Sequence, residues 1–314
     1  MTELKVCFIG VGSIAKRHII NLSHICEKRQ IALNIDAVRR CAKKGSEAVY
    51  SLINNVYGSV DEMPMDYDVI FITNPTECHL DTLNKVSSHG KHFFIEKPIT
   101  SMAQLEAANA YVPRGGSVYY VACPLRYNAV IQYIKKNIDT EKIISVRSIS
   151  SSYLPDWRPG QDYRNTYSAH KDMGGGVSID LIHEWDYLTF LFGKPGKVNA
   201  MVGKKSNLDI DSDDYAIYIA EYTNKVVELH LDYFGRKTIR EMMLFTEEDT
   251  IVGDIANNRI SFLSSNKVLE FQEERDDYQI RELEHFLDMI EGKVAEDSDI
   301  KHAIDVLRLT QGEV

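Results

Sequence analysis

Short apolar runs and amphipathic stretches alternate along the first 122 residues of the chain. The apolar runs predict strands at residues 4–9, 31–38, 69–72, 92–95 and 118–122. Between them, the spacing of apolar positions predicts helices at residues 13–28, 75–88 and 102–110. Strands that alternate with helices pair in parallel through right-handed crossovers. We therefore expect an α/β fold whose first domain, residues 1–122, is a doubly wound parallel sheet.

The pattern changes after residue 122, which predicts a second domain over residues 123–314. Its first part contains a predicted helix at residues 128–137, a strand at 143–149, a polar loop at 153–173 and a helix opened by Gly174-Gly175-Gly176. Beyond residue 193, Val227, Leu229 and Leu231 alternate with polar neighbours, which is typical of a sheet with one exposed face. Two helices are expected at the end, one with Leu283, Phe286, Leu287 and Ile290 on a single face and one capped by Ser298 or Asp299.

Composition and charge exclude several classes of protein. Of the 314 residues, 44% are hydrophobic and 26% are charged, as in ordinary globular proteins. The formal net charge of −10 disfavours a nucleic-acid-binding protein, which needs basic residues to neutralise phosphates. No apolar run approaches the roughly 20 residues that a membrane span needs, and no signal-peptide pattern opens the sequence. We expect a soluble, cytoplasmic protein.

The cysteines and the acidic clusters do not predict a metal site. The five cysteines are odd in number and lack metal-binding spacing: Cys7, Cys26, Cys41, Cys78 and Cys123. Free thiols in a reducing compartment explain them better than disulfides do. The acidic clusters at residues 209–214 and 273–277 lack the glycine of a calcium loop, so we expect solvated loops or helix caps there.

The candidate cofactor site begins with the segment Gly10-Val11-Gly12-Ser13-Ile14-Ala15, between a predicted strand and a predicted helix. Gly10 permits a tight turn, and Gly12 lets the backbone approach a pyrophosphate. Ala15 replaces the third glycine of the usual motif and still allows close packing of helix on strand. The helix would present its N–H groups to the anion from Ser13 and Ile14.

The end of the second strand bears on the choice of cofactor. An acidic residue is expected there in an NAD-binding protein, but the strand ends with Arg39-Arg40, and Asp36 lies further back. An arginine can pair with the 2′-phosphate of NADP or stack on adenine. The sequence therefore leans towards NADP over NAD, although two arginines after a strand are also common in a solvated turn.

Glu96-Lys97-Pro98 follows the predicted strand at residues 92–95, where ligands bind in such sheets. Lys97 can donate a proton or a hydrogen bond to a substrate oxygen; the alternative is a surface lysine in a turn. In the second domain, Asp180 and His183 are three residues apart, and so are His183 and Asp186. On a helix these residues share a face, so His183 is a candidate acid or base that a carboxylate one turn away would orient. Ordinary polar residues at a helix start are an equal alternative.

These segments resemble the Gfo/Idh/MocA oxidoreductases, a family that includes glucose-fructose oxidoreductase and inositol dehydrogenase. The resemblance spans nearly the whole chain and rests on GVGSIAKRH at the start, TNPTECH at 73–79, EKP at 96–98, CPLRYN at 123–128 and GGGVSIDLIHEWD at 174–186. It implies an N-terminal Rossmann domain and a C-terminal α/β domain with a large mixed, mostly antiparallel sheet that forms dimers or tetramers. It also implies hydride transfer between NAD(P) and a carbon of a sugar, cyclitol or nucleotide sugar.

The resemblance also implies roles for individual residues. Lys97 would contact the nicotinamide ribose and the substrate, His183 would be the main acid or base, and Asp180 would bind substrate. The remaining cofactor contacts would be Thr73, Asn74, Pro75, His79, Glu96 and Arg126. Two departures from the family pattern bear on this: many members separate the last Asp and His by four residues, and Asn128 stands where Pro or His is common.

The loop that contains Trp157, Arg158, Tyr163 and Arg164 is similar to a segment of family members that act on bacterial surface-polysaccharide sugars. It would cover the site, and these four residues would bind a polar or anionic substrate, the arginines through paired hydrogen bonds to a carboxylate or phosphate. An oligomer contact is the alternative for this loop.

We therefore predict an NAD(P)-dependent oxidoreductase of a sugar-type substrate that uses no metal. Two alternatives stay open. One is a non-catalytic, NADP-sensing regulator of the same fold, and the other is an enzyme that oxidises and then reduces its substrate with one tightly held cofactor.

Overall fold

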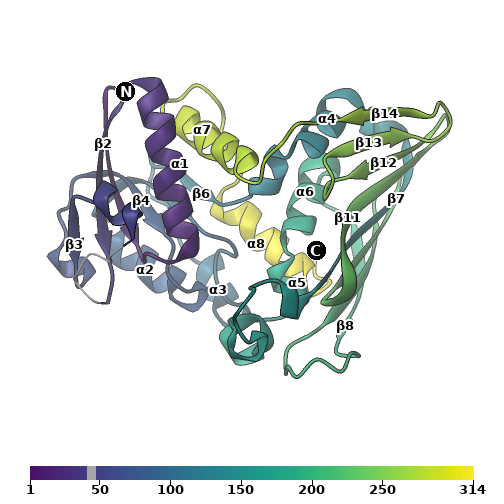
Figure 1. Cartoon of the computed structure of the whole chain (residues 1–314), viewed down its shortest axis with the longest axis horizontal. Helices are drawn as coiled ribbons and strands as arrows, with labels where there is room; N and C mark the ends of the chain where they lie inside the picture. The colour runs from purple at the N-terminus through teal and green to yellow at the C-terminus, as the bar shows by residue number, and fades with distance from the viewer. Residues whose placement is uncertain (41–46) are drawn as a thin grey trace. The chain divides into compact units, whose positions relative to one another are not determined.

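The computed structural model describes residues 1–40 and 47–314, so Cys41 lies outside the described residues. The chain forms two compact units (Figure 1). The first comprises Met1–Cys123 and Gln279–Ile304, and the second comprises Pro124–Tyr278 and Asp305–Val314. The sequence pattern places the boundary after residue 122 and keeps the rest of the chain together, whereas the structure returns residues 279–304 to the first unit.

The first unit is built on a six-stranded sheet in the order β3-β2-β1-β4-β5-β6. Its strands are β1 (Glu3–Ile9), β2 (Ala32–Val38), β3 (Asn55–Tyr57), β4 (Tyr67–Ile72), β5 (Gly90–Ile95) and β6 (Tyr119–Val121). Every neighbouring pair is parallel. This is the strand order of a Rossmann fold, which confirms the predicted doubly wound sheet.

The helices of this sheet are α1 (Ser13–Arg29), α2 (His79–Val86) and α3 (Leu105–Asn109). The described residues of this unit also form the short 3₁₀ segments η1 (Ala48–Leu52), η2 (Val60–Glu62), η3 (Thr76–Cys78) and η4 (Met102–Gln104). The second and third predicted helices are shorter than expected because η3 and η4 form their first turns.

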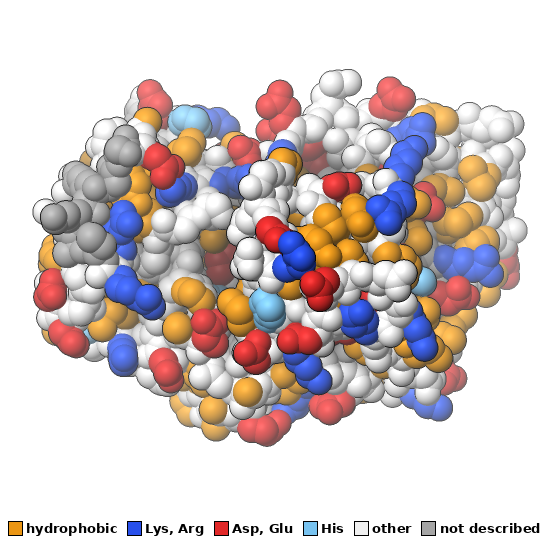
Figure 2. All heavy atoms as spheres, turned by 60° about the horizontal axis from the view of Figure 1, so that its bottom comes forward, with side chains coloured by type: hydrophobic (Ala, Val, Ile, Leu, Met, Phe, Trp, Pro, Cys, Tyr) orange, Lys and Arg blue, Asp and Glu red, His pale blue; other side chains and the backbone are white. Residues whose placement is uncertain are grey.

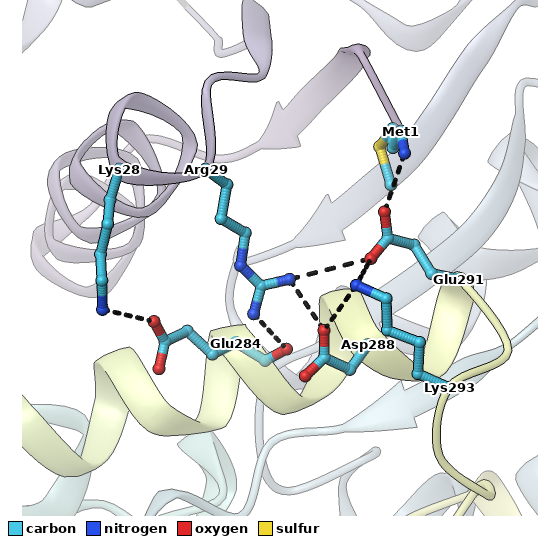
Figure 3. A network of polar contacts seen from close by, with 7 residues as sticks. All are labelled: Met1, Lys28, Arg29, Glu284, Asp288, Glu291 and Lys293. Carbon is cyan, nitrogen blue, oxygen red and sulfur yellow. Dashed lines mark hydrogen bonds and ion pairs between the residues drawn. The ribbon is translucent and has the colours of Figure 1, made fainter.

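Helix α7 (Asp277–Ile290) packs beside α1 although the two are far apart in the sequence (Figure 1). The ring of Phe286 lies 5.3 Å from that of Phe94 and 6.2 Å from that of Phe71, and His18 of α1 contacts the same two rings. Figure 3 shows the polar rim of this packing, formed by Met1, Lys28, Arg29, Glu284, Asp288, Glu291 and Lys293. Burial of Phe286 against strand side chains explains why the segment belongs to the first unit.

The second unit is built on an eight-stranded sheet in the order β14-β13-β12-β11-β7-β10-β9-β8. Its strands are β7 (Ile143–Tyr153), β8 (Lys197–Gly203), β9 (Tyr215–Glu221), β10 (Val226–Asp232), β11 (Phe234–Thr246), β12 (Thr250–Asp254), β13 (Arg259–Phe262) and β14 (Lys267–Glu270). Only β10 and β7 pair in parallel. The predicted mixed, mostly antiparallel sheet is confirmed.

One face of this sheet is covered by helices. They are α4 (Ala129–Asn137), α5 (Val177–Asp180) and α6 (His183–Phe192), while α8 (Ile300–Leu309) begins in the first unit and ends in the second. Six 3₁₀ segments complete the unit: η5 (Pro124–Tyr127), η6 (Thr140–Lys142), η7 (Leu154–Asp156), η8 (Tyr163–Asn165), η9 (Tyr167–Ala169) and η10 (Lys171–Met173). In β10 the buried apolar residues are Val227, Leu229 and Leu231, as their alternation predicts, and Asp232 at the end of the strand is buried as well. Asp299 is the cap of α8, since its Oδ1 accepts a hydrogen bond from His302 N at 2.7 Å.

The surface carries both signs of charge. On the face drawn in Figure 2, acidic and basic side chains are interspersed. In the described ranges, none of the helices has the length and apolar character needed to cross a bilayer.

Candidate active site

The turn after β1 has the geometry of a phosphate-binding loop. Gly10 has φ of 92°, and its N–H donates to the carbonyl of Val38 at 2.9 Å. A Cβ atom at Gly10 would lie 2.9 Å from the backbone of Asn74, so a larger residue does not fit. A Cβ at Gly12 would meet nothing within 4 Å, which leaves the turn open to a ligand.

The N-terminus of α1 fits an anion. Gly12 is the N-cap, no side chain caps the helix, and its first turn holds no acidic residue. Its free N–H groups and the positive end of its dipole favour a phosphate. Ala15 is fully buried, so the small side chain does provide the close contact expected of the third motif position. Gly10, Gly12, Ser13 and Ile14 therefore fit a dinucleotide pyrophosphate.

At the end of β2, Arg39 is held by Tyr50. Its Nη1 donates to the Tyr50 hydroxyl at 2.7 Å, and its Cζ lies 5.4 Å from the ring centroid. Asp36 points into the unit, where it accepts hydrogen bonds from Asn55 N at 3.0 Å and Tyr67 Oη at 2.7 Å. Asp36 is thus a buried structural group, and Arg39 and exposed Arg40 stand where the ribose ligand is expected.

The segment after β4 is tied to the glycine turn. Thr73 Oγ1 donates to the carbonyl of Gly10 at 2.8 Å, and Asn74 Nδ2 donates to Thr82 Oγ1 at 2.7 Å. Pro75 is exposed and precedes η3. The structure therefore brings Thr73 and Asn74 beside the glycine turn.

His79 joins this segment to the turn that contains Lys97. Its side chain is buried, and its two ring nitrogens lie 2.8 Å from the carbonyl oxygen of Asn74 and 3.0 Å from that of Pro98. Burial lowers the pKa of His79 below its ordinary value. His79, which we expected to contact the cofactor, therefore joins the backbone at Asn74 to the backbone at Pro98. The motif alone does not reveal this structural role.

Glu96 is held by a residue that the sequence reasoning passed over. Its Oε1 lies 2.6 Å from Nε2 of buried His18, and its Oε2 accepts a hydrogen bond from Lys97 N at 3.2 Å. Burial would raise the pKa of Glu96, but the hydrogen bond with His18 and the charges of His18 and Lys97 lower it below its ordinary value. His18 is the last residue of the GVGSIAKRH motif and lies one helix turn after buried Ala15. This position was the sequence signal that could have predicted a buried role for His18.

In the second unit, Asp180 and His183 do not lie on one continuous helix. Helix α5 ends at Asp180, Leu181 leaves the helical conformation with φ of −96° and ψ of 29°, and α6 begins at His183. The start of α5 is fixed by Asp213, whose Oδ2 accepts a hydrogen bond from Ser178 N at 2.8 Å. The prediction of a shared helix face is therefore wrong, because the chain leaves the helical conformation at Leu181 and places the two residues on separate helices.

Asp180 is a buried carboxylate among tyrosines. The Tyr233 hydroxyl donates to its Oδ2 at 2.5 Å. Burial and the charge of Asp180 raise the pKa of Tyr233 well above its ordinary value, and the same two causes raise that of Tyr167. Both hydroxyls therefore keep their protons and stay donors. His183, half-buried at the start of α6, follows three residues later.

The loop after β7 contacts this cluster at some residues only. The Trp157 ring packs edge-on against Tyr233 at 5.2 Å, and Arg158 Cζ lies 5.2 Å from the ring centroid of Tyr167. Arg164 instead donates to Asp162 within the loop, and the Tyr163 hydroxyl accepts a hydrogen bond from Asp209 N at 3.1 Å. Trp157 and Arg158 thus join the Asp180 cluster, while Tyr163 and Arg164 face other partners.

Arg126 makes a buried ion pair. Its Nε and Nη2 donate to the two carboxylate oxygens of Asp186 at 2.8 and 2.7 Å, and Phe190 packs 5.3 Å from its Cζ. Arg126, which we expected to contact the cofactor, therefore binds a carboxylate within the second unit. Asp186, which we expected to orient His183, accepts both hydrogen bonds from Arg126. Asn128 is the N-cap of α4, since its Oδ1 accepts from Val130 N at 3.0 Å, which accounts for the departure from the family pattern.

The described cysteines are free thiols, namely Cys7, Cys26, Cys78 and Cys123. Over residues 1–40 and 47–314, no group of three or more His, Cys, Asp or Glu side chains is placed to hold a metal ion.

The parallel sheet, the glycine turn and the uncapped helix define an NAD(P)-binding Rossmann protein. Two family profiles agree: the oxidoreductase family with an NAD-binding Rossmann fold matches residues 4–123, and the GFO/IDH/MocA C-terminal domain matches residues 131–249. The chain belongs to the Gfo/Idh/MocA family of oxidoreductases, which confirms the resemblance.

Relatives and solved structures of the family are distant in sequence. An uncharacterized oxidoreductase of Bacillus subtilis is 26% identical over 59% of this chain, and inositol 2-dehydrogenase of Rhizobium meliloti is 27% identical over 66% of it. The chain spans 52% and 61% of the length of these two curated relatives. The structure of UDP-N-acetylglucosamine 3-dehydrogenase from Acidithiobacillus ferrooxidans superposes with a TM-score of 0.80 at 21% identity, over 100% of this chain and 97% of that one. At this identity the structural likeness establishes the fold.

Proposed function

We propose that the protein is an NAD(P)-dependent dehydrogenase or reductase that acts on a hydroxyl or keto carbon of a sugar, cyclitol or nucleotide sugar. The observation that carries this proposal is the bracing of the turn that contains Lys97. Thr73 ties the segment after β4 to Gly10, and His79 ties the same segment to Pro98. The pyrophosphate turn and the lysine are thus fixed to one edge of one sheet, where ligands bind in this fold.

Lys97 and His183 would share the proton chemistry. When bound, the nicotinamide supplies the hydride donor or acceptor. Lys97 would hydrogen-bond the substrate oxygen and stabilise the negative charge that develops on it. His183 would take the hydroxyl proton during oxidation and return it during reduction. Neither role needs a metal ion.

Asp180 would bind a substrate hydroxyl. Its buried carboxylate already accepts from Tyr233, and a carboxylate has further lone pairs for a second donor. Trp157 packs on Tyr233 and Arg158 on Tyr167, so these two loop residues would cover the substrate next to Asp180. Tyr163 and Arg164 would bind more distant parts of it.

Arg39 and Arg40 support NADP as the preferred cofactor. The hydrogen bond to Tyr50 orients Arg39 at the end of β2, where an NAD-specific site places an acidic residue. The acidic residue of this strand, Asp36, is engaged by Tyr67 and Asn55. An oriented guanidinium suits a 2′-phosphate.

The outer face of the eight-stranded sheet would join copies of the chain into dimers or tetramers. Met201 of β8 pairs with Ile217 of β9, and their exposed fractions are 62% and 36%. Ile219 is 49% exposed on the same face. Exposed apolar residues side by side on a sheet are typical of an interface. Ile219→Lys should reduce the sedimentation coefficient to that of a monomer, and an unchanged coefficient would disprove this interface.

The free thiols support a reducing compartment, such as the cytoplasm, as the place of action. Cys7 and Cys123 are buried in strand regions and unbridged.

The test is a turnover screen of sugars, inositols and nucleotide sugars with both cofactors. Lys97→Ala and His183→Ala should each lower turnover of the best substrate on the order of 10²-fold or more. The matched controls, Lys91→Ala and His89→Ala, change surface residues of the same types and should leave it unchanged. If the panel gives no turnover while NADPH binds tightly, the protein is a regulator, and if both active-site variants keep full turnover, the role assignment is wrong.

A further inference from the structure

A groove of about 470 Å³ lies in the second unit where β7 ends and β11 begins. This volume is within the range of small-molecule sites. Among the residues that line it are Tyr153, Tyr163, Lys205, Asn207, Phe234 and Arg236. Tyr153 and Phe234 are paired across the two strands. Tyr233 is buried against Asp180, whereas its neighbour Phe234 is 36% exposed in the groove. The residues that line the groove do not include Asp180, Tyr167 or Tyr233, so the groove is separate from the Asp180 cluster.

Two buried aspartates hold the two walls of the groove. Asp214, fully buried, accepts hydrogen bonds from Lys205 N and Ser206 N, both at 2.8 Å, and so fixes the turn that carries Lys205. Asp232 accepts from Phe234 N at 3.1 Å and from Gly235 N at 2.9 Å, and so fixes the turn that leads to Arg236. The groove is thus preorganised, because its walls are backbone turns bound to buried carboxylates.

The groove contains two cationic side chains, Lys205 and Arg236, that form no ion pair within the described residues. The Arg236 Cζ lies 3.8 Å from the ring centroid of Tyr153, which orients the guanidinium. Across the described part of the chain, neither Lys205 nor Arg236 makes an ion pair. Asp209 of the same turn has its carboxylate 3.8 Å from Arg164 Nη1. The carboxylates of Asp214 and Asp232 accept hydrogen bonds from backbone N–H groups of the groove walls. In a protein with a net charge of −10, such a pair of cations in a built groove favours an anionic ligand.

The groove also offers flat apolar surfaces. Phe234 is part-exposed, and the Tyr163 ring is held in place by the hydrogen bond from Asp209 N to its hydroxyl. Nucleobases stack on rings of this kind, and the Asn207 amide can pair with a base edge.

We propose that this groove binds a nucleoside diphosphate, with its phosphates on Lys205 and Arg236 and its base on the aromatic residues. This proposal rests on the proposed function and makes it more specific, since it identifies the substrate as a nucleotide sugar. The loop after β7 touches both places, since Trp157 packs on Tyr233 while Tyr163 lines the groove. A nucleotide in the groove would therefore order the loop that covers the Asp180 cluster.

Calorimetric titration of the full chain with UDP tests the proposal. The protein is first saturated with NADPH, so that the Rossmann domain is occupied. We expect saturable binding of UDP, which Arg236→Ala and Lys205→Ala each weaken about tenfold or more. Lys204→Ala, a neighbouring lysine outside the groove lining, should bind as the unchanged protein does, and Arg236→Lys should recover part of the affinity. Thermal melts establish that each variant is folded.

Three results would overturn the proposal: no saturable binding of UDP at millimolar concentration, equal affinity in both alanine variants and the unchanged protein, or pyrophosphate binding as tightly as UDP. The last would mean a simple anion site without base recognition. A competition experiment distinguishes the two forms of the ligand. UDP-N-acetylglucosamine displaces UDP if the groove binds the nucleotide part of a nucleotide sugar, and does not displace it if the groove binds only free nucleotide.

Failure of this groove is distinguishable from failure of the proposed function. Lys97→Ala should abolish hydride transfer and keep UDP binding. If oxidation of a sugar persists while UDP does not bind, the groove proposal fails alone.

Discussion

The imidazole Nε2 of His18 lies 2.6 Å from Oε1 of Glu96, in a contact that joins α1 to the end of β5. The rings of Phe71 and Phe94 surround the imidazole, and its exposed fraction is 1%. The second oxygen of Glu96 accepts from Lys97 N. A buried histidine on the first helix therefore fixes the backbone that presents the proposed catalytic lysine.

This contact should make part of the stability of the protein depend on pH. The pKa of Glu96 is lowered in the folded protein, so its contribution is present above the unfolded value of about 4.3 and is lost as pH falls through the folded value. His18→Gln should lower the free energy of unfolding by about 1–3 kcal/mol near pH 6. The difference between the two proteins should shrink in urea titrations between about pH 5 and pH 3. A difference that is constant with pH would contradict this account of the pair.

The Tyr233 hydroxyl should stabilise the buried carboxylate of Asp180. Tyr233→Phe keeps the ring and removes the donor, so the free energy of unfolding should fall by about 1–3 kcal/mol. Substrate affinity should fall too, if Asp180 binds the substrate. Tyr133→Phe is the control, since that half-buried tyrosine packs on Phe271 through its ring, and its effect should be within about 0.5 kcal/mol. Equal effects of the two variants in urea unfolding would refute the role of the hydroxyl.

The pair of Arg126 and Asp186 should matter for folding more than for cofactor binding. Arg126→Met leaves a buried carboxylate without its guanidinium, which should cost about 3–5 kcal/mol. The double variant Arg126→Met/Asp186→Leu should recover most of this loss, because no charge then stays buried. Lys136→Met on exposed α4 surface is the control for loss of a positive charge. Calorimetry and NADPH titration check both parts, and a stable Arg126→Met protein with weakened NADPH binding would restore Arg126 as a cofactor ligand.

Arg39 should determine the preference for the phosphorylated cofactor. Arg39→Ala should weaken NADPH binding about tenfold and leave NADH binding within about twofold, because only NADPH has the 2′-phosphate. Tyr50→Phe, which removes the hydrogen bond that orients Arg39, should give a smaller loss in the same direction. Fluorescence titration of the two reduced cofactors measures this. Equal losses for both cofactors would mean that Arg39 does not read the phosphate.

Local patterns determined how much of this was predictable from the sequence. The apolar runs and the Gly10 turn identified the parallel sheet, since strand alternation and a positive φ leave direct marks on residue choice. The break between α5 and α6 at Leu181 left no such mark in the residues around it. The start of α5 left none either, because it is fixed by Asp213, which lies 35 residues from Ser178. The destination of α7 was equally hidden: its apolar face was visible, but not that Phe286 packs on Phe71 and Phe94.

The candidate site divides in the same way. Gly10, Thr73 and Glu96 each directly follow a strand of the parallel sheet, as the apolar runs before them predict. The roles of His79 and Arg126 as ligand contacts stay predictions. Their protein partners, Pro98 and Asp186, were not predictable, since a motif gives the identity of a polar residue and not the partner that its side chain meets.

The transfer of deuterium from reduced cofactor to product tests the central claim most directly. NADPH and NADH deuterated at C4 of the nicotinamide are incubated with the protein and keto forms of sugars, inositols and nucleotide sugars, and the products are analysed by mass spectrometry and NMR. The account predicts deuterium on the new carbinol carbon of at least one product, with the label lost in Lys97→Ala and His183→Ala. Tight binding of the cofactor with no deuterium in any product would contradict it.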